Sequence, residues 1–137
     1  MPIIIPPGKS EAVFRSLCYL ALGVAGVWVL LDPPSTVEGT IGVVLTFVWG
    51  ACMLSAFIGS VASLRRRYRV EYMSLPLTIA GVAIYAYTIW LQVADLSTRG
   101  PQALIVTAIA FCLAGRFTTL HRLVYSWKGG PWTGSAQ

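Results

Sequence analysis

Residues 40–64 read TIGVVLTFVWGACMLSAFIGSVASL, and the basic cluster RRRYR follows directly at 65–69. The run contains no charged residue and exceeds the roughly 20 apolar residues that an α-helix needs to cross a bilayer. Lysine and arginine gather at the cytoplasmic ends of membrane spans. The stretch therefore predicts a transmembrane helix whose carboxyl end lies in the cytoplasm.

The composition of the whole chain agrees with a membrane protein. Of its 137 residues, 56% are hydrophobic and 11% are charged, and the mean hydropathy is +0.72. A soluble domain carries about 25% charged residues. Four spans of about 20 residues would use most of the chain. We therefore expect a single membrane domain over 1–137.

A second apolar run covers 12–31 and ends before Pro33 and Pro34. Two consecutive prolines cannot continue a helix, so the run stops there. It is too long for the core of a signal peptide, and no small-residue cleavage site follows it. We expect an uncleaved first span.

Two more spans are expected at 74–94 and 102–122. Pro76 stands near the start of the former, where the first turn of a helix tolerates proline. Gly100 and Pro101 precede the latter, as a cap and a first helical residue. The predicted fold is an all-α integral membrane four-helix bundle with short loops.

The basic residues fall on alternate sides of these spans. Of the ten lysines and arginines, only Arg99 lies on the far side if there are four spans. This asymmetry predicts a multi-pass protein of the cell (inner) membrane with both the N and C termini cytoplasmic. The net charge of +5 is placed beside apolar runs, which favours the lipid bilayer and its anionic lipids, and not nucleic acid, as partners. The candidate lipid contacts are Arg65, Arg66, Arg67, Arg69, Arg116, Arg122 and Lys128.

The fourth span is expected to continue as an amphipathic basic extension over 116–128. Its apolar residues recur at helical spacing, which is typical of a helix at the membrane surface. The long stem of Arg116 is expected to carry its guanidinium to the lipid headgroups. The polar, glycine-rich segment 129–137 is expected to be a flexible tail.

Small residues recur every four positions in 40–64, at Ala51, Ser55, Gly59 and Ser63. Such a stripe lets another helix approach closely, because lipid provides no hydrophobic force between spans. The partner helix is either another span of the same chain or a second copy. The pattern leaves both open, and with the second a homo-oligomer.

Residues that carry chemistry are scarce inside the predicted spans. All five acidic residues are expected at span ends or in loops, which leaves no ionised group in the membrane interior. The single histidine, His121, cannot supply the paired ligands of a haem cytochrome. The three cysteines show no paired spacing and are expected to be buried apolar residues. We expect no enzyme, no cofactor and no metal site.

Four spans, minimal loops, the 65–69 cluster and the 116–128 segment together resemble the small multi-span phage membrane proteins of the holin type. The resemblance covers most of the chain. It implies a non-enzymatic, membrane-permeabilising protein that acts by lateral oligomerisation. Two alternatives remain open: an accessory or scaffold subunit packed against a larger membrane-protein partner, and a small oligomeric channel or transporter.

Overall fold

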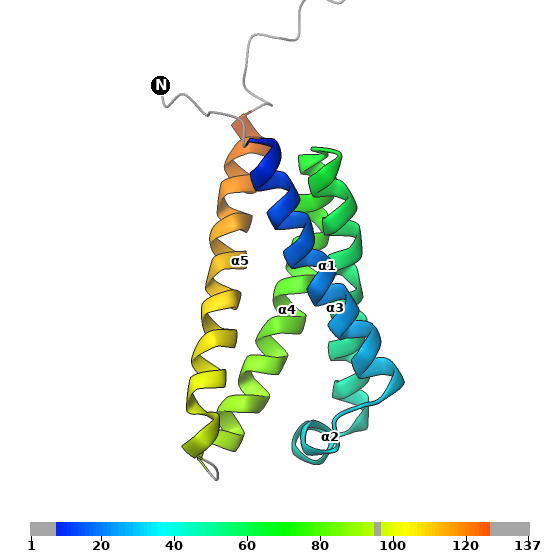
Figure 1. Cartoon of the computed structure of the whole chain (residues 1–137), viewed down its shortest axis with the longest axis vertical. Coiled ribbons are helices and arrows are strands. Elements are labelled where there is room, and N and C mark those ends of the chain that lie inside the picture. The colour runs from blue at the N-terminus through cyan, green and yellow to red at the C-terminus, as the bar shows by residue number, and fades with distance from the viewer. Residues whose placement is uncertain (1–7, 95–96, 127–137) are drawn as a thin grey trace, which may run out of the picture.

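A computed structural model describes residues 8–94 and 97–126, and within these ranges the chain is helical without strands (Figure 1). Four of its helices are long and apolar enough to cross a membrane. This confirms the predicted all-α membrane bundle. The elements are α1 (Lys9–Leu31), α2 (Ser35–Ile41), α3 (Val43–Leu64), α4 (Tyr68–Val93), the 3-10 helix η1 (Ser97–Arg99) and α5 (Gly100–Ser126).

Two helices differ from the predicted pattern. The short α2 separates α1 from α3 and was not expected. Helix α4 begins at Tyr68, earlier than residue 74, so that Pro76 stands inside the helix and not in its first turn. The hydropathy of the sequence did not indicate a helix start at Tyr68, because the charged residues Arg69 and Glu71 lie in the first turn of α4. The side chain of Pro76 is exposed, and the proline removes one backbone donor from the helix.

The long helices pack in the order α1, α3, α4, α5. Helix α3 lies beside both α1 and α4, and α4 lies beside α5. Among the described residues, no Cα atom of α1 comes within 8 Å of one in α4 or α5. In Figure 1 the ribbons of α1 and α5 diverge from the end at which α1 starts and α5 stops. The bundle is therefore a bent row whose first and last helices do not pack backbone to backbone.

Helices α1 and α3 approach closely at glycines. A Cβ atom added at Gly26 would lie 2.7 Å from Cβ of Met53 and 3.0 Å from the carbonyl oxygen of Gly50. Nearer the start of α1, the hydroxyls of Ser16 and Ser60 lie 2.8 Å apart. Small residues thus bring the two backbones together, and hydroxyl groups join them, as expected for helices in lipid.

The small-residue stripe lies mostly inside the chain. Ser55 is buried, and its hydroxyl lies 2.8 Å from that of Thr78 on α4. Gly59 and Ser63 are also buried, and the hydroxyl of Ser63 donates to the carbonyl oxygen of Ala12 on α1. Ala51 differs, because it is exposed on the outer face of α3. Three of the four stripe residues therefore face helices of the same chain.

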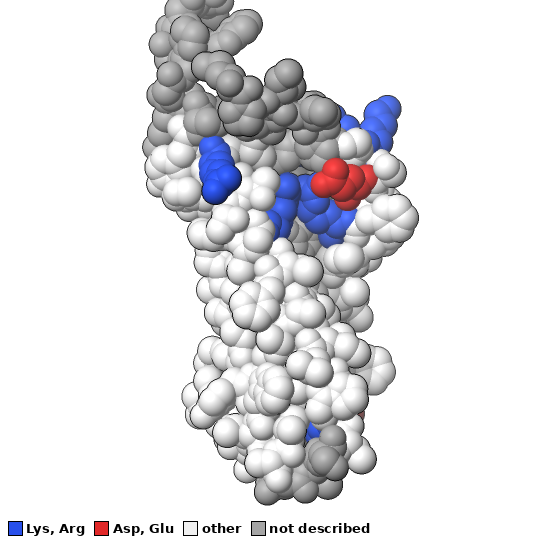
Figure 2. Space-filling view, turned by 90° about the vertical axis from the view of Figure 1, so that its left-hand side faces the viewer, with Lys and Arg blue, Asp and Glu red and all other residues white. Residues whose placement is uncertain are grey.

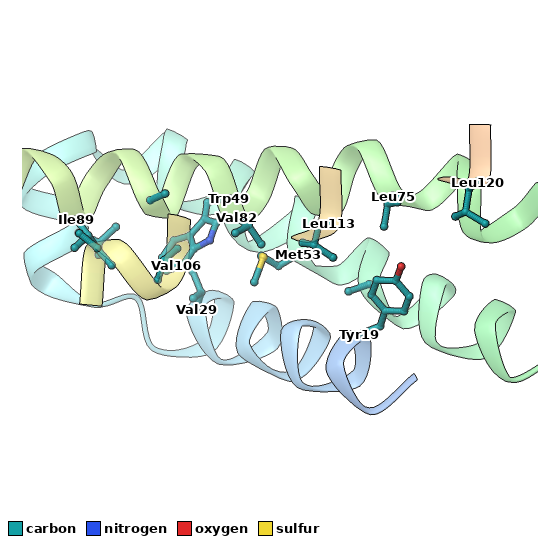
Figure 3. Close-up of a cluster of buried hydrophobic side chains, with 14 residues drawn as sticks. Tyr19, Val29, Trp49, Met53, Leu75, Val82, Ile89, Val106, Leu113 and Leu120 are labelled. Carbon is teal, nitrogen blue, oxygen red and sulfur yellow. The ribbon is translucent and has the colours of Figure 1, made fainter. Parts of the chain in front are cut away.

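Side chains of all four spans meet in one apolar core (Figure 3). Figure 2 shows one face of the molecule, which carries almost no charge between its two ends, while most of its basic side chains gather at one end beside acidic ones. We call this the basic end. Cys18 and Cys112 lie on the exposed surface and not in the core, against expectation, while Cys52 is half-buried. Core residues drawn and labelled in Figure 3 are Tyr19, Val29, Trp49, Met53, Leu75, Val82, Ile89, Val106, Leu113 and Leu120.

Replacing Gly26 with leucine should force α1 away from α3. The added side chain meets backbone and the base of Met53, so the strain cannot be relieved by moving a flexible tip. We expect a loss of at least about 1–3 kcal/mol of stability, measured by SDS-induced unfolding in mixed micelles. Gly115→Leu is the matched control, because nothing lies within 4 Å of a Cβ added there. Equal losses for both variants would contradict the close approach.

Candidate functional site

A carboxylate lies fully buried between three helices near the basic end. Glu71, in the first turn of α4, has no exposed surface. Its Oε1 accepts hydrogen bonds from the hydroxyl of Tyr19 on α1 at 3.1 Å and from Nε of Arg116 on α5 at 3.1 Å. Its Oε2 accepts from an Arg116 terminal nitrogen at 3.3 Å. Both oxygens of the carboxylate are thus engaged by neighbouring helices.

Arg15 extends this group toward the surface. One of its terminal nitrogens lies 3.8 Å from Oε1 of Glu71, and the other donates to Oε1 of Glu11 at 2.8 Å. The Glu11–Arg15 pair is one helical turn apart, a spacing that favours ion pairing. Two arginines and two carboxylates balance each other. We call Glu11, Arg15, Tyr19, Glu71 and Arg116 the Glu71 cluster.

The Glu71 cluster corrects one prediction. Arg116 was expected to reach the headgroups, yet its guanidinium turns inward to Glu71, and its side chain is 16% exposed. Glu71 was expected at the end of a span and does stand in the first turn of α4, but its burial between helices was not expected. The reason is tertiary: the basic partners of Glu71 come from α1 and α5, which are remote in sequence. A signal existed in the helical spacing of Glu71, Ser74 and Thr78, which form one buried polar stripe on α4.

The arrangement of the Glu71 cluster restricts what it can do. Intramembrane carboxylates serve transporters when they are available to protons or substrate cations. Glu71 is instead held by donors from two other helices, and its position is fixed by them. Removing one partner from a buried ion pair leaves an uncompensated charge and strongly destabilises a protein. The chemistry is therefore that of an interhelical tie: Glu71 connects α1, α4 and α5.

A second polar contact joins α4 to α5 at the basic end. The hydroxyl of Tyr72 lies 2.9 Å from Nδ1 of His121, and the Tyr72 ring stacks on that of Phe117 with centroids 4.9 Å apart. The ring of Tyr125 lies beside His121. These contacts hold the extension of α5 in place. The helix runs through Ser126, in keeping with the expected extension of the fourth span; Lys128 and the tail at 129–137 lie outside the described residues.

The predicted lipid contacts form an exposed basic rim. Arg65, Arg66, Arg67, Arg69 and Arg122 are exposed, and within 8–94 and 97–126 the ion pairs involve only Arg15 and Arg116 among the basic residues. The rim is thus available to an anionic partner. Binding to anionic lipid stays a prediction.

No family model, curated protein or solved structure matches the chain. Among the described residues, no group of three or more histidine, cysteine or acidic side chains is placed to hold a metal ion.

Replacing Glu71 with alanine should destabilise the bundle far more than replacing Glu11. Glu71→Ala leaves Arg116 without a carboxylate partner and removes the hydrogen-bond acceptor of Tyr19. We expect the free energy of unfolding to fall by about 3–5 kcal/mol. Glu11 is exposed and pairs only within α1, so Glu11→Ala should cost less than about 1 kcal/mol. SDS-induced unfolding in mixed micelles, followed by circular dichroism, measures both. A small effect at Glu71 would show that the tie contributes little.

Proposed function

We propose that this protein permeabilises a membrane in the manner of a holin, by lateral oligomerisation and without enzymatic chemistry. One observation carries the proposal: serine and threonine side chains of α1, α3 and α4 are buried inside the bundle, while large apolar side chains are exposed along all four spans. The face in Figure 2 carries almost no charge between its two ends. A water-filled pore needs a polar lining. Among the described residues, the buried serine and threonine side chains of the spans can supply one if the helices rearrange.

Buried hydroxyls in the carboxyl-terminal half of α3 pair with hydroxyls of both neighbouring helices. Ser55 meets Thr78 on α4, and Ser60 meets Ser16 on α1. The Glu71 cluster follows at the basic end. We call the packed bundle of Figure 1 the closed state. In this state the buried hydroxyl and charged groups hydrogen-bond to one another, so the protein is stable in lipid. In a ring of several copies, the same groups would line a shared lumen once α1 moved off α3.

Among the buried side-chain nitrogens and oxygens of the described residues, one has no hydrogen-bond partner. Nε1 of Trp49 is buried without a hydrogen-bond acceptor among the described residues, while its ring stacks on Tyr85 with centroids 4.8 Å apart. A buried donor without a partner costs about 1–3 kcal/mol. A hydrated arrangement recovers this energy, which favours a second state of the bundle.

In this proposal both termini and the basic end face the cytoplasm of a cell whose inner membrane holds the protein. The rim of exposed arginines then lies at the level of anionic headgroups. Copies of the chain accumulate in the bilayer in the closed state. Permeabilisation follows when enough copies have gathered to open together.

An accessory subunit of a larger membrane complex is the alternative. It is favoured by the row-like packing, because α5 packs closely on α4 alone among the spans and exposes large apolar side chains such as Phe111, on which a helix of a partner could pack. A subunit of this kind binds a partner stoichiometrically and leaves the membrane intact.

Inducible expression in bacteria with a membrane-potential dye separates the two. A permeabilising protein should leave the potential intact during a delay and then abolish it abruptly, because opening depends on the number of copies. Unchanged potential at high membrane levels, with a stoichiometric partner recovered in mild detergent, would establish the accessory role instead.

A disulfide between positions 16 and 60 should prevent permeabilisation. In a background of Cys18→Ala, Cys52→Ala and Cys112→Ala, the Ser16→Cys, Ser60→Cys pair replaces hydroxyls 2.8 Å apart, close enough for a disulfide with little movement. Dye-loaded vesicles that contain the oxidised protein should release no more dye than dye-loaded vesicles without protein. Reduction of the disulfide should restore the leakage.

The matched control for the lock is the single Ser16→Cys variant in the same background, treated with the same oxidant. It should leak whether oxidised or reduced. Leakage through the oxidised double variant would mean that α1 and α3 need not separate.

A further inference from the structure

Helix α1 is joined to the rest of the bundle unequally at its two ends. At its carboxyl end, residues 32–34 connect it covalently to α2. At its amino end, within the described residues, its attachments are noncovalent. Along α1 the close backbone approaches are to α3 alone, since no described Cα atom of α4 or α5 lies within 8 Å of it.

The amino-terminal half of α1 is nevertheless tied to the other two spans. Tyr19 donates to Glu71 on α4, and Arg15 lies 3.8 Å from the same carboxylate. Arg116 of α5 engages that carboxylate from the other side. Among the described residues, Glu71 is the one side chain that accepts hydrogen bonds from both α1 and α5.

We propose that Glu71 is a latch that holds the amino-terminal half of α1 against α4 and α5, and that release of this latch lets α1 swing outward about its connection to α2. The connection to permeabilisation rests on the proposed function. The movement of α1 is a property of the bundle itself.

Electrostatics make the latch a switch with two states. With the carboxylate in place, Arg15 and Arg116 are attracted to a common centre from two helices. Without the charge of Glu71, Arg116 has no carboxylate partner, and the cluster carries one excess positive charge because Glu11 compensates only Arg15. The two guanidinium groups then repel each other. Since each is partly exposed, at 13% and 16%, outward movement of α1 gives both access to water. The neutralised cluster therefore favours separation.

The native cysteines provide the measurement. Cys18 on α1 and Cys112 on α5 are both exposed and lie within about one helical turn of Tyr19 and Arg116 respectively. After Cys52→Ala, both are labelled with nitroxides, and the distance between them is measured by pulsed electron resonance. The protein is held in phosphatidylethanolamine–phosphatidylglycerol vesicles. Labelled protein is mixed with an excess of unlabelled protein that lacks all three cysteines, which removes the distances between labels on different copies.

Glu71→Gln should shift this distance to longer values and broaden its distribution. Glu38→Gln is the matched control: it removes a carboxylate on α2, outside the Glu71 cluster, and it should leave the distribution unchanged. An unshifted distribution in Glu71→Gln, or an equal shift in Glu38→Gln, overturns the latch.

Tyr19→Phe keeps the test decisive if Glu71→Gln folds poorly. It removes one donor to Glu71 and keeps the ring that packs in the core, so it should give a smaller shift in the same direction. No shift in a well-folded Tyr19→Phe variant, as judged by helical circular dichroism, counts against the latch.

The membrane-potential assay then connects the latch to function. Cells expressing Glu71→Gln should depolarise earlier than cells expressing the parent at equal membrane levels. A distance shift without depolarisation by either protein supports the latch and rejects the proposed function. Depolarisation by the parent without a distance shift in Glu71→Gln supports the function and rejects the latch.

Discussion

The carboxylate of Glu71 lies where α1, α4 and α5 meet, and it accepts hydrogen bonds from the first and last of these helices. Within the described residues α1 has no close backbone approach to α4 or α5, so side chains must hold this corner together. A charge inside a bundle is tolerated only where partners surround it. The placement of Tyr19, Arg15 and Arg116 follows from that requirement.

Helix content and span number could be predicted because they depend on local properties of the sequence. Apolar length, the Pro33–Pro34 stop and the arginines after Leu64 each act within one segment. The Glu71 cluster depends on residues more than 40 positions apart, such as Tyr19 with Glu71 and Arg116 with Glu71. No local pattern contains that information. Hydropathy therefore directed Arg116 to the headgroups and gave no sign that Glu71, at the start of α4, is buried between helices.

The small-residue stripe shows a second limit of prediction. Spacing identified Ser55, Gly59 and Ser63 as positions for a close helix, and the structure places α1 and α4 there. Ala51 has the same spacing but is exposed. A repeat of four residues drifts around a helix with 3.6 residues per turn, so its first and last members cannot face one neighbour. Spacing alone cannot show which members leave the contact.

The polar interior connects stability with the proposed activity. Hydroxyls and charges that pair inside the closed chain remove the cost of burying them in lipid. The same groups become hydrophilic surface when the pairs separate in the presence of water. A purely apolar interior would hold the helices by packing alone and would offer no lining to a lumen. Under the proposed function, the pairs Ser16–Ser60 and Glu71–Arg116 would hold isolated copies in the closed state and would supply the polar lining of an open assembly.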